Sequence, residues 1–180
     1  TGGGVSSLPA INGLADDRLK ISVDGMTITS ACPNHMNPAL SYIAPVALSH
    51  INVYAGVVPV SQGGDSIGGA IHVLSVAPEF AKPGEGYQTS GNLSTYYRGN
   101  GDVKGASARA SLASEDFNLT YIGNTVDAGN YDDGDGKVVG ASRYKVRNHA
   151  VKLAMKQGDD LFSLDVGWQD IPLQGFPNQA

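Results

Sequence analysis

The sequence has little charge, a single cysteine and no long apolar run among its 180 residues. Charged residues make up only 16% and the net charge is −5, so there is no basic stripe that could follow the phosphates of a nucleic acid. One cysteine excludes an internal disulfide framework. No segment approaches ~18 consecutive apolar residues, which excludes a transmembrane helix but leaves open a transmembrane barrel, whose strands are short and half apolar.

Arrangements typical of catalysis are missing as well. No Ser/His/Asp or paired-carboxylate pattern can be argued from the spacing, and we expect no enzyme activity. His50, His72 and His149 are isolated in the sequence and are expected to be structural. The chain starts at Thr1 without a methionine or an apolar signal segment and stops just past an apolar strand, so we expect both ends to be cut and any export signal to be absent.

The residues that are abundant favour sheet over helix. There are 24 glycines and 8 tyrosines, with few of the residues that favour helices. Residues 1–78 hold short, irregular apolar pieces, of which 18–23, 51–54 and 71–76 are expected to be strands. The first of these should end in a tight turn at Asp24-Gly25.

Two polar segments have a structural explanation that is favoured over ligand binding. Residues 61–70 carry two Gly-Gly pairs, but no lysine follows and no helical period begins, so a phosphate loop is not expected. We expect these glycines where segments pack closely or φ is positive. Residues 131–136 offer oxygen ligands for Ca²⁺ but lack the EF-hand spacing, which favours a solvated acidic loop.

From Gly86 onward the pattern becomes regular, with alternating segments of about ten residues separated by turn signals. One face of each predicted strand carries apolar residues and the other carries polar or charged residues. Lys152 and Asp165 belong to the polar face. The apolar positions are Ala106, Ala108, Ala110 and Leu112, then Phe117, Leu119 and Tyr121, then Val151, Leu153 and Met155, then Phe162, Leu164, Val166 and Trp168.

The connections between these strands alternate in length. The links at 114–116 and 157–160 are minimal turns, whereas the link at 127–142 is long. Outer-membrane barrels show this asymmetry, with short turns on one side and long loops on the other. Charged side chains on the strands should then face the lumen. Five strands cannot close a barrel, so either they are part of a larger barrel or the membrane interpretation is wrong. An interfacial girdle near the strand ends is expected from Tyr96, Tyr97, Tyr121, Tyr144 and Trp168.

The only cysteine lies in the segment Cys32-Pro33-Asn34-His35-Met36. Thiolate and thioether sulfur atoms favour Cu(I) among the common biological metals, so a Cys-x-x-x-Met pair in a turn indicates a copper site. On these five residues alone, an inert thiol in a Pro/Asn turn is the favoured interpretation.

Three further segments carry a resemblance to a known family. Residues 51–56 and 63–73 resemble the closing part of the plug domain of TonB-dependent outer-membrane receptors, and Leu19 to Gly25 resembles a plug strand with its D-G turn. The resemblance implies a mainly β fold, with the C-terminal part of a plug domain at 1–80 and about five antiparallel strands of an incomplete transmembrane β-barrel at 81–180. It also implies an outer-membrane location and lipid contact, and a TonB partner whose contact segment is absent from this chain.

Within that family, residues 32–38 and 174–179 look most like the copper receptor branch. This resemblance implies that Cys32 and Met36 bind copper as the transported ligand, with His35 inside the motif in a less certain role. The remaining ligands, a His and a Met of a barrel loop, are expected beyond Ala180. Two alternatives stay open: a receptor of the same architecture for a siderophore, haem or cobalamin, and a soluble exported β-rich binding module.

Overall fold

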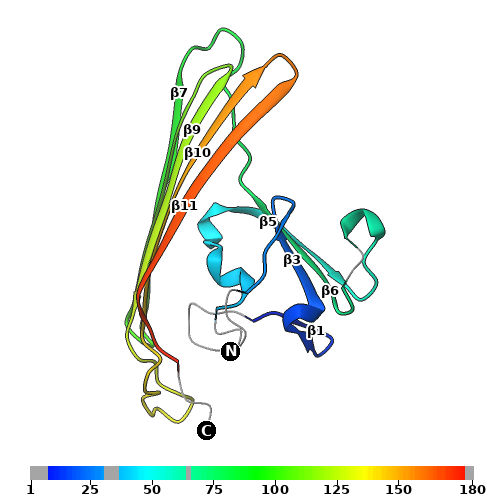
Figure 1. Cartoon of the computed structure of the whole chain (residues 1–180). Helices are drawn as coiled ribbons and strands as arrows, with labels where there is room; N and C mark the ends of the chain where they lie inside the picture. The colour runs from blue at the N-terminus through cyan, green and yellow to red at the C-terminus, as the bar shows by residue number, and fades with distance from the viewer. Residues whose placement is uncertain (1–7, 31–36, 64–65, 177–180) are drawn as a thin grey trace. The chain divides into compact units, whose positions relative to one another are not determined.

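A computed structural model describes residues 8–30, 37–63 and 66–176. The chain divides into two compact units, Thr1–Val76 and Ala77–Ala180, which are described separately (Figure 1). The domain ranges 1–80 and 81–180 stay predictions, because compactness alone does not define where a plug domain ends. The described residues form strands and short 3-10 turns without an α-helix, and none of their helical turns has the length or apolar character to cross a membrane.

The first unit is built on a four-stranded sheet with the order β4-β3-β6-β5. β3 runs parallel to β6, and the other neighbours are antiparallel. The expected strands at 18–23, 51–54 and 71–76 correspond to β3, β5 and β6 with shifted ends. The elements are β1 (Ala10–Ile11), β2 (Leu14–Ala15), η1 (Asp16–Arg18), β3 (Leu19–Val23), β4 (Met26–Thr27), η2 (Ala39–Tyr42), η3 (Pro45–Ala47), β5 (Leu48–Ala55), η4 (Val60–Gln62) and β6 (Gly69–Ser75).

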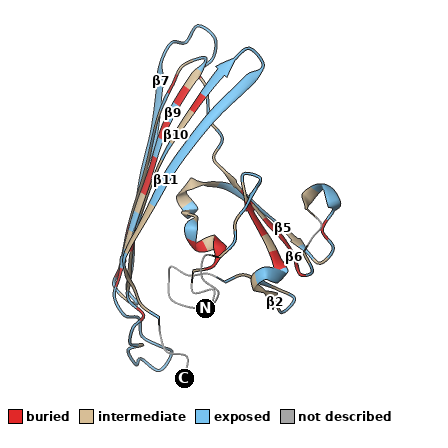
Figure 2. Ribbon diagram, viewed as in Figure 1, coloured by how far each residue is buried: buried red, intermediate tan, exposed pale blue. Residues whose placement is uncertain are grey.

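Buried residues of this unit lie on its sheet and on η2 (Figure 2), and one hydrophobic cluster joins them. The parallel register places Ile21 beside Ile71, and both pack with Val73 and with Ala39 of η2. The expected turn after β3 is confirmed, because Asp24 and Gly25 both have positive φ (49° and 85°). The apolar alternation of β3 therefore builds the core of the first unit.

The second unit is an antiparallel meander of five strands in the order β11-β10-β9-β8-β7. Each strand pairs with the next one in the sequence, which confirms the mainly β fold with five antiparallel strands. Among the described residues β7 and β11 do not pair with each other, so the sheet is open. The strands are β7 (Gln88–Arg98), β8 (Val103–Ala113), β9 (Phe117–Ala128), β10 (Tyr144–Gln157) and β11 (Asp160–Gln174).

The strand register collects the apolar side chains on one face of this sheet, called here the apolar face. One row across β8–β11 consists of four paired leucines, Leu112, Leu119, Leu153 and Leu164. In the next row, Val151 pairs with Tyr121 on one side and with Val166 on the other. These side chains are not covered: Phe162, Leu164, Val166 and Trp168 are 60–66% exposed. A soluble sandwich would bury this face against a second sheet.

The opposite face, called the polar face, holds the buried polar groups. Asn118 and Thr120 are 1% and 4% exposed. The Asn118 amide donates to the Glu79 carbonyl (2.6 Å) and to Ser111 Oγ (3.1 Å), and Thr120 Oγ1 donates to Asn118 Oδ1 (2.9 Å). Lys152 Nζ lies 2.9 Å from Asp165 Oδ2 on this same face, as the alternation predicted. The polar face therefore buries Asn118 and Thr120 together with Ile122 and Ala154, whereas the apolar face leaves its large side chains exposed.

The links confirm the predicted alternation of short turns and long loops. Residues 114–116 and 158–159 form short turns, and residues 129–143 form the long β9–β10 loop at the opposite ends of the strands. The expected aromatic girdle is partly wrong. Tyr96, Tyr97 and Tyr144 do lie at strand ends, but β9 and β11 continue well beyond the apolar alternation. Tyr121 and Trp168 consequently lie inside those strands.

Candidate functional site

The predicted metal ligands Cys32, His35 and Met36 lie outside the described residues, but both flanks of their segment are described. Ser30 Oγ donates a hydrogen bond to the main-chain carbonyl of Asn37 at 3.1 Å. This bond joins the last described residue before the segment to the first described residue after it. The two residues that flank the segment are therefore held close together.

Both flanks are also anchored in the first unit. On the N-terminal side, the Ile28 amide donates to the Ile21 carbonyl (2.9 Å), and Ile28 packs against the core. On the C-terminal side, Ala39 is 5% exposed and belongs to that core. The Pro38 carbonyl accepts hydrogen bonds from Ser41 N (2.8 Å) and Ser41 Oγ (2.6 Å), which fixes the start of η2. Both flanks are thus fixed to the core of the first unit by packing and hydrogen bonds.

A small pocket lies beside this base. Asp16, Asp17, Ser30 and Pro38 line it together with apolar side chains, and its volume is about 40 Å³. A pocket of this size can hold a few water molecules, whereas organic ligands occupy sites of roughly 300 Å³ or more. Its carboxylates are hard oxygen donors, unlike the sulfur atoms that favour Cu(I). The pocket therefore does not provide an organic ligand site in the first unit.

The glycine-rich segment has a structural role, as its composition predicted. Gly63 has φ +87° and Gly69 has φ +130°, values that favour glycine. A Cβ atom on Gly69 would lie 2.2 Å from the carbonyl oxygen of Tyr54 on the neighbouring strand. Gly68 donates its amide hydrogen to the Arg18 carbonyl (2.8 Å). The glycines let β5 and β6 pair at this end of the sheet.

The histidines that looked isolated in the sequence have different surroundings in the structure. His50 lies beside Ser49 Oγ (3.1 Å), and His72 makes an edge contact with the Tyr54 ring (5.4 Å between centroids). His149 lies between Tyr121 and Trp168, a cluster that sequence reasoning missed and that only the pairing register of β9–β11 could have indicated. In the three described ranges, no group of three or more His, Cys, Asp or Glu side chains could hold a metal ion.

The acidic loop uses its carboxylates to shape its own backbone. Asp133 Oδ1 accepts hydrogen bonds from the amides of Asp135 and Lys137, both at 2.9 Å. Asn100, in the β7–β8 turn, donates to the Asp132 carbonyl and accepts from its amide. These contacts agree with the loop interpretation of residues 131–136, because the Asp133 carboxylate accepts hydrogen bonds from the backbone of its own turn.

Comparisons with known proteins agree with the two-unit architecture. Residues 1–70 match the family model of the TonB-dependent receptor plug domain. A solved structure described as the copper transporter OprC superposes with a TM-score of 0.86 at 26% sequence identity and covers 98% of this chain. The FrpB iron transporter from Neisseria meningitidis (F3-3 variant) shares the fold, with a TM-score of 0.72 at 21% identity over 92% of this chain. A search of the curated proteins finds no match.

Residues 1–70 match a plug domain, and the second unit is an open meander with an exposed apolar face; both features are typical of an outer-membrane receptor. The chain is similar to the TonB-dependent receptors of the bacterial outer membrane, through the plug-domain match over residues 1–70 and the likeness to OprC. It spans 26% of the length of the structural neighbours OprC and FrpB.

Proposed function

We propose that the whole protein is a TonB-dependent receptor that imports copper, bound by Cys32 and Met36 with His35 alongside. The observation that carries the proposal is the Ser30–Asn37 hydrogen bond, which joins the residues on either side of the segment that holds these three residues. A chain whose flanks are joined has fewer conformations to lose when a thiolate and a thioether within it bind one ion. The OprC structure, described as a copper transporter, supports the choice of metal.

The proposed transport sequence is capture followed by release. Cys32 as thiolate and Met36 as thioether would bind Cu(I), and a barrel loop outside this chain would complete the coordination. Release then requires that the geometry of the segment change, because a tightly held ion leaves only when its binding state is made less favourable. TonB would provide this work through the plug domain.

Titration of the full-length receptor with Cu(I) tests the proposal. Cys32→Ala and Met36→Ala should each weaken Cu(I) binding by more than about 100-fold. Mutation of residues that only orient the metal ligands already lowers metal affinity by about 10–100-fold. Met26→Ala is the matched control, because Met26 is an exposed methionine of the same unit outside the segment. Equal Cu(I) affinity in wild type and both ligand variants would contradict the copper site.

The second candidate is a receptor for an iron chelate or another metal complex. Its support is the fold alone, since the FrpB structure, described as an iron transporter, superposes over 92% of this chain. Uptake assays in cells that carry the receptor separate the two candidates. Copper uptake that is lost in Cys32→Ala supports the first; siderophore, haem or cobalamin uptake that is unchanged in Cys32→Ala supports the second.

A further inference from the structure

A groove crosses the apolar face of the second unit, and it is called here the outer groove. Its floor consists of small residues, Ala106 and Ala108 of β8 and Gly123 of β9. Leu93 of β7 forms one wall, and the Tyr121–His149 pair of β9 and β10 forms the other. The groove has a volume of about 320 Å³, within the range of ligand sites.

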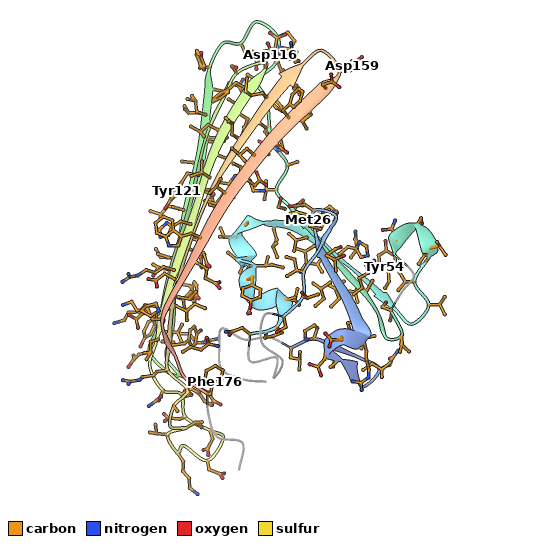
Figure 3. All side chains as sticks on the ribbon, viewed as in Figure 1. Met26, Tyr54, Asp116, Tyr121, Asp159 and Phe176 are labelled. Atoms are coloured by element: carbon orange, nitrogen blue, oxygen red, sulfur yellow. The ribbon has the colours of Figure 1, made fainter. Side chains whose placement is uncertain are left out.

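The wall on the β9–β10 side is held in place by specific contacts. Tyr121 Oη and His149 Nδ1 are 2.7 Å apart, and the His149 ring lies 4.7 Å from the Trp168 ring. Gly123 makes room for Tyr121, because a Cβ atom there would lie 2.6 Å from the Tyr121 hydroxyl. Figure 3 shows Tyr121 projecting from the sheet. The groove is therefore formed before any ligand arrives.

One end of the groove carries positive charge. Arg147 lines this end and makes only a loose ion pair with Asp170 (3.6 Å), which leaves most of its five N–H donors available. The next row toward the long-loop end holds Lys145 and Asp127, paired at 2.6 Å, and Lys104 opposite Asp127. Arg147, Lys145 and Lys104 thus lie among the carboxylates of Asp102, Asp127 and Asp170, beyond the rows of apolar side chains.

We propose that the outer groove binds a membrane lipid with a phosphate headgroup. One acyl chain lies on the Ala/Gly floor between Leu93 and the Tyr121–His149 wall, and the phosphate meets Arg147. An apolar channel that ends at a guanidinium matches this amphiphile, because Arg binds phosphate in a bidentate manner and the chain leaves water. This lipid is separate from the transported metal and contacts the opposite side of the sheet from the buried polar network.

Native mass spectrometry of the full-length receptor in detergent tests the headgroup contact. Dipalmitoyl phosphatidic acid should remain bound more often than dipalmitoylglycerol, which has the same chains without the phosphate. Arg147→Gln should lower the affinity for phosphatidic acid about fivefold, the effect of one charge near a membrane surface. Asp170→Asn should raise it, because it releases Arg147. Equal binding of the two lipids, or no change in either variant, would overturn the proposal.

A second pair of variants tests the acyl-chain contact. Ala108→Trp fills the floor of the groove and should reduce phosphatidic acid binding about tenfold. Val166→Trp adds the same bulk to the same exposed face outside the groove and should leave binding unchanged. Equal losses in both variants would show general lipid contact and overturn a specific site. A receptor dimer that forms through this face without lipid would overturn the proposal as well.

Discussion

Val73 in the four-stranded sheet and Asn118 in the five-stranded sheet are equally buried, each with 1% of its surface exposed. Val73 packs with Ile21 and Ile71, whereas Asn118 is surrounded by hydrogen-bond partners. The first unit buries apolar side chains, as proteins in water do. In the second unit a buried hydrogen-bond network lies on one face of the sheet and large apolar side chains are exposed on the other, which is expected where the apolar face meets lipid.

Truncation in the core of the first unit should have the largest effect on stability. Ile71→Ala removes a side chain that is 5% exposed, and it should destabilise the unit by about 2–5 kcal/mol. Ile51→Ala on β5 is the matched control, because Ile51 is 48% exposed. Hydrogen exchange of the β3 and β6 amides in the full-length receptor measures the difference. Similar exchange rates in the two variants would mean that the first unit is not stabilised by a buried apolar core.

A charge on the apolar face of the second unit should have a nearly equal effect for a different reason. Val166→Arg places a cation where lipid is expected, at a cost of about 2–4 kcal/mol near the bilayer midplane. Ser163→Arg is the control, because Ser163 lies on the other face of β11. Unfolding of the receptor in lipid vesicles compares the two. If Val166→Arg is as well tolerated as Ser163→Arg, the apolar face is not in lipid.

The sequence predicted the strands of the second unit well because their period is strictly two. Val151, Leu153 and Met155 lie on one face because alternate residues of a strand do so regardless of how the neighbouring strands pair. Strand length was predicted less well, since β9 and β11 extend through polar residues whose ladder pairing depends on partners far away in the chain. For this reason Trp168 was expected at a strand end and lies inside β11.

The candidate site was predictable only in its ligand chemistry. Cys32 and Met36 suggest copper by their sulfur atoms alone, and this remains a prediction. The Ser30–Asn37 bond could not be foreseen, because a serine hydroxyl has many local acceptors and the choice depends on how Ile28 and Ala39 pack. The Tyr121–His149–Trp168 cluster required the register of three strands, which no local pattern specifies.

Loss of a buried polar network should destabilise the second unit by a smaller amount. Asn118→Leu leaves the Glu79 carbonyl and the Ser111 and Thr120 hydroxyls with fewer partners, at a cost of about 1–3 kcal/mol. Asn124→Leu is the control, since its buried Oδ1 has no hydrogen-bond partner among the described residues. Urea unfolding of the receptor should show a lower midpoint for the first variant only. A lower midpoint for both would indicate a general intolerance of leucine on the polar face.

The smallest expected effect concerns the polar contacts outside both sheet faces. Asn100 exchanges two hydrogen bonds with the main chain of Asp132, at 2.9 and 2.7 Å, and the contact is exposed. Because water replaces such bonds easily, Asn100→Ala should cost about 1 kcal/mol or less. The Asp132 amide should exchange up to about fivefold faster, while the β8 and β9 amides stay unchanged. Asn100→Asp keeps the acceptor and loses the donor, so it should largely preserve protection of that amide. Faster exchange throughout the strands would instead mean that the loops support the sheet, and that its stability does not come from the two faces alone.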